Sequence, residues 1–117
     1  MAVEVEQKSA YELCPRFEKT FGILGKKWNG LIIDVLLSEG PQRFKDIANK
    51  VDKCSDRVLV ERLKELEVQG LVTKTPLVDS CRDVYQLTEQ GEDLAGIIGQ
   101  VHDWAEKWYT LADCTTD

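Results

Sequence analysis

The stretch SDRVLVERLKELEVQGLVTKT, residues 55–75, contains the change of pattern that decides the fold. It opens with Ser55, a residue type favoured at helix N-caps, and leucines then recur at helical spacing up to Gly70. Glycine commonly ends a helix, and after Gly70 apolar and polar residues alternate with the period of two that is typical of a strand. The stretch therefore predicts a helix from Ser55 to about Gln69, followed at once by a β-strand. The core side of this helix carries Leu59, Leu63 and Leu66.

Three apolar patterns upstream of residue 55 predict three more helices. The first begins at Pro15, because proline is favoured at the first helical position, and Cys14 is then its N-cap. The second covers about residues 28–38 and is apolar enough to be central, and the third runs from residue 43 or 44 to Val51. We expect the first helix to bury an aromatic stripe of Phe17, Phe21 and Leu24, the second to bury Trp28, Leu31, Ile32, Val35 and Leu36, and the third to expose Arg43, Lys45 and Lys50.

The last third of the chain predicts a hairpin and a long helix. Two short strands, residues 71–75 and 83–87, flank the turn-like residues 78–80. Thr88 then caps a helix whose apolar positions keep helical spacing for five turns. So long a stripe at the edge of a small domain needs a partner to cover it, and we expect a second copy of the chain. The stripe consists of Leu94, Ile97, Ile98, Val101, Trp104, Trp108 and Leu111.

This order of elements is typical of a winged helix-turn-helix, a mainly α fold with a small β-hairpin as its wing. In that fold the capped end of the second helix enters the major groove of DNA, and the hairpin reaches the adjacent backbone. Arg57 is suited to a bidentate guanine contact, whereas Asp56 or Glu61 would accept from cytosine or exclude poor sites. The alternative is an ordinary solvated helix face. The predicted DNA-binding residues are Arg43, Lys45, Ser55, Asp56, Arg57, Val60, Glu61, Lys64, Lys74 and Arg82.

The distribution of charge limits where DNA could bind. The 117 residues suffice for one compact core, and their net charge of −6 argues at first against a DNA partner. The charge is uneven, however, because residues 1–40, 41–75 and 76–117 carry net charges of −1, +2 and −7. A DNA-binding protein needs only one positive face, and the acidic remainder can point elsewhere. We therefore expect the binding surface to lie between about Arg43 and Lys64.

Composition and motifs also indicate how the chain is organised. We expect an N-terminal arm over residues 1–12, a winged helix-turn-helix domain over 13–88, and a C-terminal dimerisation helix and tail over 89–117. No apolar run approaches the roughly 20 residues that cross a bilayer, so a cytosolic protein is expected. The four cysteines are too dispersed for a zinc site or a disulfide framework. Nothing resembles a catalytic triad or a phosphate loop, so we expect neither an enzyme nor a cofactor, and we interpret His102 and Trp104 as packing residues.

Several sequence blocks, in their order and spacing, resemble the HxlR-type winged helix-turn-helix regulators of bacteria over roughly residues 13–108. The resemblance implies a homodimeric regulator that binds a pseudo-palindromic double-stranded DNA operator and joins its subunits through the terminal helices. The chain departs from the family pattern at Lys26, at Cys54 and at Ser80-Cys81 in the wing. The matching blocks are Cys14-Pro15, Gly25-Lys26-Lys27-Trp28, Arg43-Phe44-Lys45-Asp46-Ile47, Ser55 with Arg62-Leu63-Lys64-Glu65-Leu66-Glu67, Gly70-Leu71-Val72, and Tyr85-Gln86-Leu87-Thr88-Glu89-Gln90-Gly91.

Cys14 and Cys54 are the candidate redox-sensing residues. Several members of the family sense oxidants or electrophiles through a cysteine at the start of the first helix, and Cys14 matches that position. Independently, a helix N-cap favours a thiolate, which accepts backbone N–H bonds and lies at the positive end of the helix dipole. The alternative is that Cys14 is a small buried hydrophobe. Cys54 is expected to pack against Leu59, although the adjacent Lys53 would favour a thiolate there. A disulfide between Cys14 of one subunit and Cys54 of the other is a further hypothesis, and it would require their Cα atoms to lie within about 7 Å.

Three hypotheses of function follow. The first is a regulator that responds to oxidants or quinone-like electrophiles through its cysteines. The second keeps DNA binding but replaces thiol chemistry with a small aromatic or quinone-like effector held between the first helix and the dimer helix. The third is a winged-helix protein-interaction module, which predicts little dependence of DNA affinity on salt, whereas several phosphate contacts predict a steep one.

Overall fold

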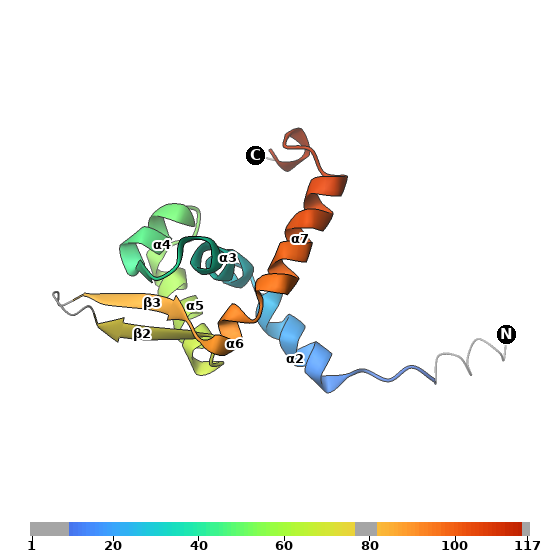
Figure 1. Cartoon of the computed structure of the whole chain (residues 1–117), viewed down its shortest axis with the longest axis horizontal. Helices are drawn as coiled ribbons and strands as arrows, with labels where there is room; N and C mark the ends of the chain where they lie inside the picture. The colour runs from blue at the N-terminus through green and yellow to red at the C-terminus, as the bar shows by residue number, and fades with distance from the viewer. Residues whose placement is uncertain (1–9, 77–81, 116–117) are drawn as a thin grey trace.

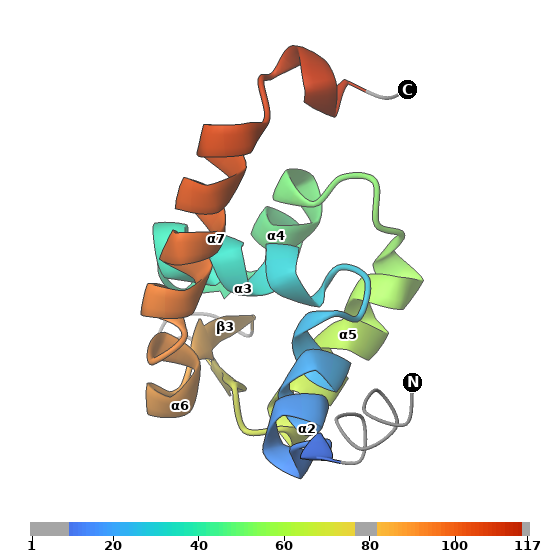
Figure 2. The same ribbon diagram turned by 90° about the vertical axis from the view of Figure 1, so that its right-hand side faces the viewer.

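The core of the domain forms where helices α3 and α5 meet a small sheet. The computed structural model describes residues 10–76 and 82–115 (Figures 1 and 2). Within them the elements, in chain order, are α2 (Pro15–Leu24), α3 (Asn29–Glu39), β1 (Gln42–Arg43), α4 (Phe44–Lys50), α5 (Asp56–Val68), β2 (Val72–Pro76), β3 (Asp83–Leu87), α6 (Glu89–Glu92), α7 (Ala95–Trp108) and the 3₁₀ turn η1 (Ala112–Cys114).

The buried side chains confirm the predicted core of α5 and correct that of α3. The three predicted leucines of α5 are 0–1% exposed. Leu31, by contrast, is 54% exposed, whereas its neighbours Ile32 and Ile33 are fully buried. Because α3 is apolar on nearly every side, its periodicity could not decide which side faces inward. The core cluster contains Ile32, Ile33, Leu36, Ile47, Val51, Cys54, Leu59, Leu63, Leu66, Leu71, Val72 and Leu87.

The turn between α2 and α3 is held in an unusual conformation. Trp28, the N-cap of α3, has φ of 80°, in the left-handed region that is rare for residues other than glycine. Asn29 is buried, and its Nδ2 donates to the backbone oxygen of Ile23 at 2.9 Å. Trp28 is half-buried against the core, so burial and the Asn29 bond together fix a turn that would otherwise be costly.

The sheet has three antiparallel strands in the order β1-β3-β2, one more than predicted. The predicted hairpin is confirmed, with β2 displaced by one residue, and the expected turn at residues 78–80 lies outside the described residues. Strand β1 pairs Gln42 with Tyr85 and Arg43 with Val84. Arg43, predicted to open a helix, is therefore both a strand residue and the N-cap of α4. This pairing attaches the start of α4 directly to the wing.

Helices α2 and α7 extend from the body of the domain on the side away from the wing (Figure 1). Most of the apolar side chains in their stripes are exposed. The prediction that α2 buries its aromatic stripe is wrong within this chain, because α2 has no buried residue and Phe17 and Phe21 are 61% and 56% exposed. The two rings pack against each other, with centroids 4.9 Å apart. The described chain alone therefore leaves a large apolar surface on α2 exposed to water.

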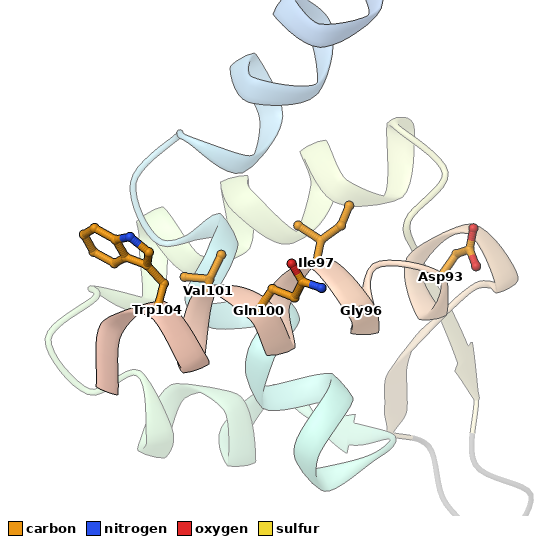
Figure 3. A pocket seen from close by; sticks show the side chains of 6 residues that line it. All are labelled: Asp93, Gly96, Ile97, Gln100, Val101 and Trp104. Atoms are coloured by element: carbon orange, nitrogen blue, oxygen red, sulfur yellow. The ribbon is translucent and has the colours of Figure 1, made fainter. Parts of the chain in front are cut away.

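The predicted long C-terminal helix is in fact two helices. Thr88 caps only the four-residue α6, by accepting from the N–H of Gly91, and a turn at residues 93–94 precedes α7. Figure 3 shows Ile97, Val101 and Trp104 along α7, where they line an open hollow of about 560 Å³. These three side chains are 51–57% exposed. The expectation that the stripe needs a covering partner thus gains support from its exposure.

Candidate nucleic-acid interface

The free face of α5 carries every residue that was predicted for it. Ser55 is the N-cap, and its Oγ accepts from the backbone N–H of Val58 at 3.2 Å. This bond satisfies one of the N–H groups that have no partner within the helix and leaves the first turn well defined. All six predicted residues are exposed, including the apolar Val60 at 42%. They are Ser55, Asp56, Arg57, Val60, Glu61 and Lys64.

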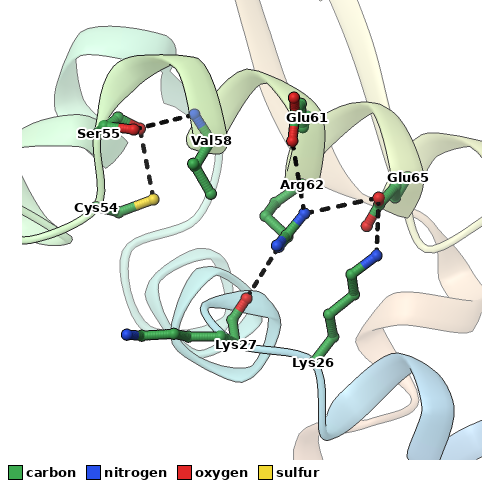
Figure 4. Close-up of polar contacts among 8 residues, drawn as sticks. All are labelled: Lys26, Lys27, Cys54, Ser55, Val58, Glu61, Arg62 and Glu65. Carbon is green, nitrogen blue, oxygen red and sulfur yellow. Dashed lines mark hydrogen bonds and ion pairs between the residues drawn. The ribbon is translucent and has the colours of Figure 1, made fainter.

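A polar network that was not predicted fixes the orientation of α5 (Figure 4). Arg62 Nε donates to the backbone oxygen of Lys27 at 3.0 Å, and its Nη1 lies 3.6 Å from Glu65 Oε2. Glu65 Oε2 also pairs with Lys26 Nζ at 3.0 Å. The Arg62 side chain is only 16% exposed, so part of this network is shielded from solvent. The network joins α5 to the turn that follows α2. The one indication of it in the sequence was the position of Arg62 next to the buried Leu63.

A second candidate region, in which three basic side chains and the acidic Asp83 line one cleft, lies between the start of α4 and the wing. A cleft of about 440 Å³ lies between Arg43 and Lys45 on one side and Arg82 and Tyr85 on the other. Lys45 and Arg82 are exposed, whereas Arg43 is half-buried and its Nε lies 3.5 Å from Asp46 Oδ2. The pairing between β1 and β3 brings these predicted residues together from distant parts of the sequence.

The wing contributes less positive charge than its composition suggests. Lys74 Nζ lies 4.0 Å from Asp83 Oδ2 and 5.8 Å from the centre of the Tyr85 ring. The Tyr85 hydroxyl stays protonated at neutral pH, because burial raises its pKa further. Part of the charge of Lys74 is therefore already balanced within the hairpin.

The two candidate redox residues lie in different environments. Cys14 is the N-cap of α2 and is exposed, but its thiol makes no capping hydrogen bond, so the predicted thiolate-to-backbone contact is absent from the described chain. The alternative of a buried Cys14 is not seen either. Cys54 is 5% exposed within the core cluster, and its Sγ donates to the backbone oxygen of Ser55 at 3.5 Å.

The environment of Cys54 agrees with the packing interpretation. Burial raises the pKa of its thiol, nearby Arg62 opposes this shift, and Asp56 adds to it. The thiolate at Cys54 is therefore disfavoured despite the adjacent helix start. Cys114 is exposed in η1, where its Sγ donates to the backbone oxygen of Thr110 at 3.4 Å, and Cys81 lies outside the described residues.

One further cavity lies where the ligand-sensor hypothesis expected an effector. It has a volume of about 310 Å³ between α2 and the α6–α7 segment, and its walls include Ile23, Leu24, Leu94 and Ile97. Within residues 10–76 and 82–115, no three His, Cys, Asp or Glu side chains gather as a metal site. A search of the same residues finds no helix with the length and apolarity needed to span a bilayer.

A short helix α4, an exposed Ser-capped helix α5 and a following β-hairpin define a winged helix-turn-helix protein. The model of the HxlR-like helix-turn-helix family matches residues 23–113, and the chain belongs to this family of transcriptional regulators. The HTH-type transcriptional regulator YvaP of Bacillus subtilis is 46% identical over 98 residues, which span 83% of this chain and 90% of YvaP. YodB of the same organism, also an HTH-type transcriptional regulator, is 41% identical over 102 residues, which span 86% of this chain and 90% of YodB.

Solved structures of YodB and HypR have the same fold. Reduced YodB from B. subtilis superposes with a TM-score of 0.73 at 41% identity, over 83% of this chain and 95% of that one. Quinone-bound YodB gives a TM-score of 0.71 at 41% identity, over 81% of this chain and 100% of that one. The redox regulator HypR in its oxidised form superposes with a TM-score of 0.74 at 30% identity, over 83% of this chain and 99% of that one.

Proposed function

We propose that the chain is a cytoplasmic homodimeric regulator that binds DNA through α5, and that thiol chemistry at Cys14 controls this binding. The exposed face of α5 is the observation that carries the proposal, because five exposed residues follow a defined N-cap, Ser55, which is itself exposed. The side chains at its start include one guanidinium, that of Arg57, which suits guanine in the major groove. The cleft between α4 and the wing would take the adjacent phosphates, which position the protein without specifying sequence.

Replacing Arg57 tests the role of α5. Loss of a bidentate base contact should weaken binding to the DNA upstream of the chain's own gene by about 1–3 kcal/mol, or roughly 5- to 150-fold. Lys19→Ala is the matched control, because it removes one exposed positive charge from α2. Fluorescence anisotropy with that duplex and with a scrambled duplex measures both variants. Equal affinities for Arg57→Ala and Lys19→Ala would contradict the proposed base contact.

The apolar stripes of α2 and α7 support dimerisation by a second copy of the chain. On α7 alone Val101, Trp104 and Trp108 are 57–62% exposed, and monomers rarely leave apolar patches of this kind uncovered. A two-fold dimer would present its recognition helices to half-sites about 34–36 Å apart, or a multiple of that spacing. The expected operator is therefore pseudo-palindromic.

A charge placed on the stripe should dissociate the dimer. Val101→Asp puts a carboxylate into the proposed interface, whereas Ala95→Asp puts the same charge on an exposed residue in the first turn of α7, where it is favourable. Sedimentation velocity should give dimers for the wild type and for Ala95→Asp, and monomers for Val101→Asp. A wild-type monomer at micromolar concentration would refute the proposed dimer.

The exposure of Cys14 supports its role as the sensor, and quinone-bound YodB is a structural precedent for an electrophile on this fold. The Cys14 thiolate would add to a ring carbon of a quinone, forming a C–S bond, while protons from water complete an S-linked hydroquinone. Treatment with 1,4-benzoquinone should add one quinone mass at Cys14 and lower DNA affinity. Cys14→Ser should abolish both effects, and the exposed Cys114 supplies the control variant Cys114→Ser. A response that survives Cys14→Ser would rule out this sensor.

A Cys14–Cys54 disulfide between subunits remains a separate proposal. Diamide would accept the two electrons and two protons that the thiols lose when the S–S bond forms. Because Cys54 is buried, the bond requires local opening before α5. A non-reducing gel should show a cross-linked dimer that disappears in Cys14→Ser and in Cys54→Ser. Persistence of that dimer in both variants would exclude the pair.

The cavity of about 310 Å³ between α2 and α7 supports the second candidate, a regulator with a non-covalent aromatic effector. DNA release by a quinone would then survive Cys14→Ser and would reverse on dilution. Release that requires Cys14 and resists dilution favours thiol chemistry.

A further inference from the structure

The attachment of α7 to the rest of the domain depends on few contacts. No residue of α7 is buried, although Ile98 of α7 and Leu94 just before it are half-buried against the core. A cavity of about 330 Å³ lies between α7 and the start of α3. The short turn at residues 93–94 separates α6 from α7 and provides a hinge. Side-chain packing therefore leaves the angle of α7 incompletely determined.

One polar contact crosses this loosely packed junction. Nε2 of His102, on α7, lies 2.9 Å from Oδ1 of Asp34, on α3. Both residues line the cavity, with side chains 55% and 32% exposed. Among the side-chain hydrogen bonds of the described residues, the His102–Asp34 bond is the one that joins α7 to α3. Asp34 lies 68 positions before His102, so the prediction that His102 is a packing residue did not include this contact.

The charged groups around His102 favour its protonated form. The hydrogen bond to Asp34 raises the pKa of His102 above 6.5, and the charges of Asp34 and then of Glu106 and Asp103 act in the same direction. Lys26, from the turn between α2 and α3, lines the same cavity and carries the opposite charge. The imidazolium–carboxylate attraction is complete at acidic pH and is lost as the pH rises through the raised pKa of His102.

We propose that the His102–Asp34 pair is a positioning pair that sets the angle between α7 and α3, and so the separation of the two recognition helices in the dimer. This inference depends on the proposed dimer. When α7 joins the subunits and α3 anchors α5 through the core, a change of the α7–α3 angle moves the two α5 helices relative to each other. Protonation of His102 thereby adjusts the spacing of half-sites that the dimer accepts.

The separation of the two α5 helices can be measured without DNA. Val68→Cys places a nitroxide at the exposed end of α5, away from the proposed DNA-binding residues. Cys14, Cys81 and Cys114 are replaced by serine in this variant, whereas Cys54 is retained because its burial should protect it from the label. Electron–electron spin distances are recorded at about pH 6 and about pH 8.5, on either side of the titration of His102.

The main intersubunit distance should differ between the two pH values by several ångströms. A tilt of roughly 10° over a 14-residue helix of about 21 Å moves its far end by about 4 Å. The midpoint of the change should coincide with the His102 titration followed by NMR of its imidazole. Circular dichroism at both pH values checks that each protein is folded.

Three variants of His102 and Asp34 distinguish the proposed positioning role of this pair from general effects of pH on the protein. His102→Lys keeps a cation and should hold the acidic distance at both pH values. His102→Gln leaves Asp34 without a cationic partner, and Asp34→Asn leaves His102 without a carboxylate partner. Both variants therefore lack the imidazolium–carboxylate pair and should lose the pH-dependent change in distance. A dimer whose wild-type distance does not change with pH, or one that changes equally in His102→Gln, would overturn the positioning role alone. Absence of any intersubunit distance would overturn the proposed dimer as well.

Discussion

Arg62→Ala should destabilise the domain by about 2 kcal/mol, because it removes the contact that orients α5. The bond from Arg62 Nε to the Lys27 oxygen is 3.0 Å long, and its loss leaves that carbonyl without its charged donor. A hydrogen bond to a charged group contributes about 1.5–3 kcal/mol. The Arg62–Glu65 pair adds little, about 0–1 kcal/mol, because Glu65 is 41% exposed and keeps Lys26 as a partner.

The expected fall in Tm follows from the size of the chain. At about 2.1 cal/mol/K per residue, 117 residues give an unfolding entropy of roughly 0.25 kcal/mol/K, so about 2 kcal/mol corresponds to about 8 °C. Thermal unfolding followed by circular dichroism at one fixed protomer concentration measures it, because a dimer's Tm depends on concentration. Glu61→Gln is the control, since Glu61 is exposed and lies 3.9 Å from Arg62, and it should change stability by less than about 0.5 kcal/mol. Equal Tm values for Arg62→Ala and Glu61→Gln would refute the anchoring role.

Two glycines and two cysteines give further predictions. A Cβ at Gly91 would collide with the backbone oxygen of Leu71, whereas one at Gly96, in α7, meets nothing within 4 Å. Gly91→Ala should therefore lower the free energy of unfolding by about 2 kcal/mol or more, and Gly96→Ala should raise it by up to about 1 kcal/mol. Urea unfolding measures both. An unchanged stability of Gly91→Ala would contradict the close approach of Gly91 to the Leu71 oxygen. Native Cys14 should react readily with a thiol reagent and Cys54 only after unfolding, because Cys14 is exposed and Cys54 is buried. Comparable rates for the two thiols in the native protein, read by mass spectrometry, would show that Cys54 is not protected.

The elements with local signals could be predicted from the sequence. The cap at Ser55, the leucine spacing and the stop at Gly70 suffice for α5, and Pro15 suffices for the start of α2. Strand β1 could not be predicted, because its two residues are too few to show a period. The break before α7 was also missed, since Leu94, in the turn that precedes α7, has the same helical spacing as the apolar stripe that follows it.

The exposed residues of the candidate site could be predicted from the sequence, whereas the contacts that hold its helices in place could not. The exposed face of α5 follows from the same periodicity that buries its leucines. Arg62 reaches Lys27 across 35 positions, and His102 reaches Asp34 across 68, so only the tertiary arrangement reveals these contacts. The burial of Cys54 followed from its position before a helix. The aromatic spacing on α2, by contrast, could not show whether the rest of the chain covers that stripe, and the structure leaves it exposed.

The central claim is that a dimer of this chain binds specific DNA, and its most direct test is a salt series of affinities for the duplex upstream of the chain's own gene. With roughly six phosphate contacts per dimer, the affinity should fall by about 10³ between about 50 and about 200 mM salt. The preference for this duplex over a scrambled one should remain at about 10³ or more at physiological salt. Equal affinity for both duplexes, or an affinity that does not change with salt, would contradict the claim.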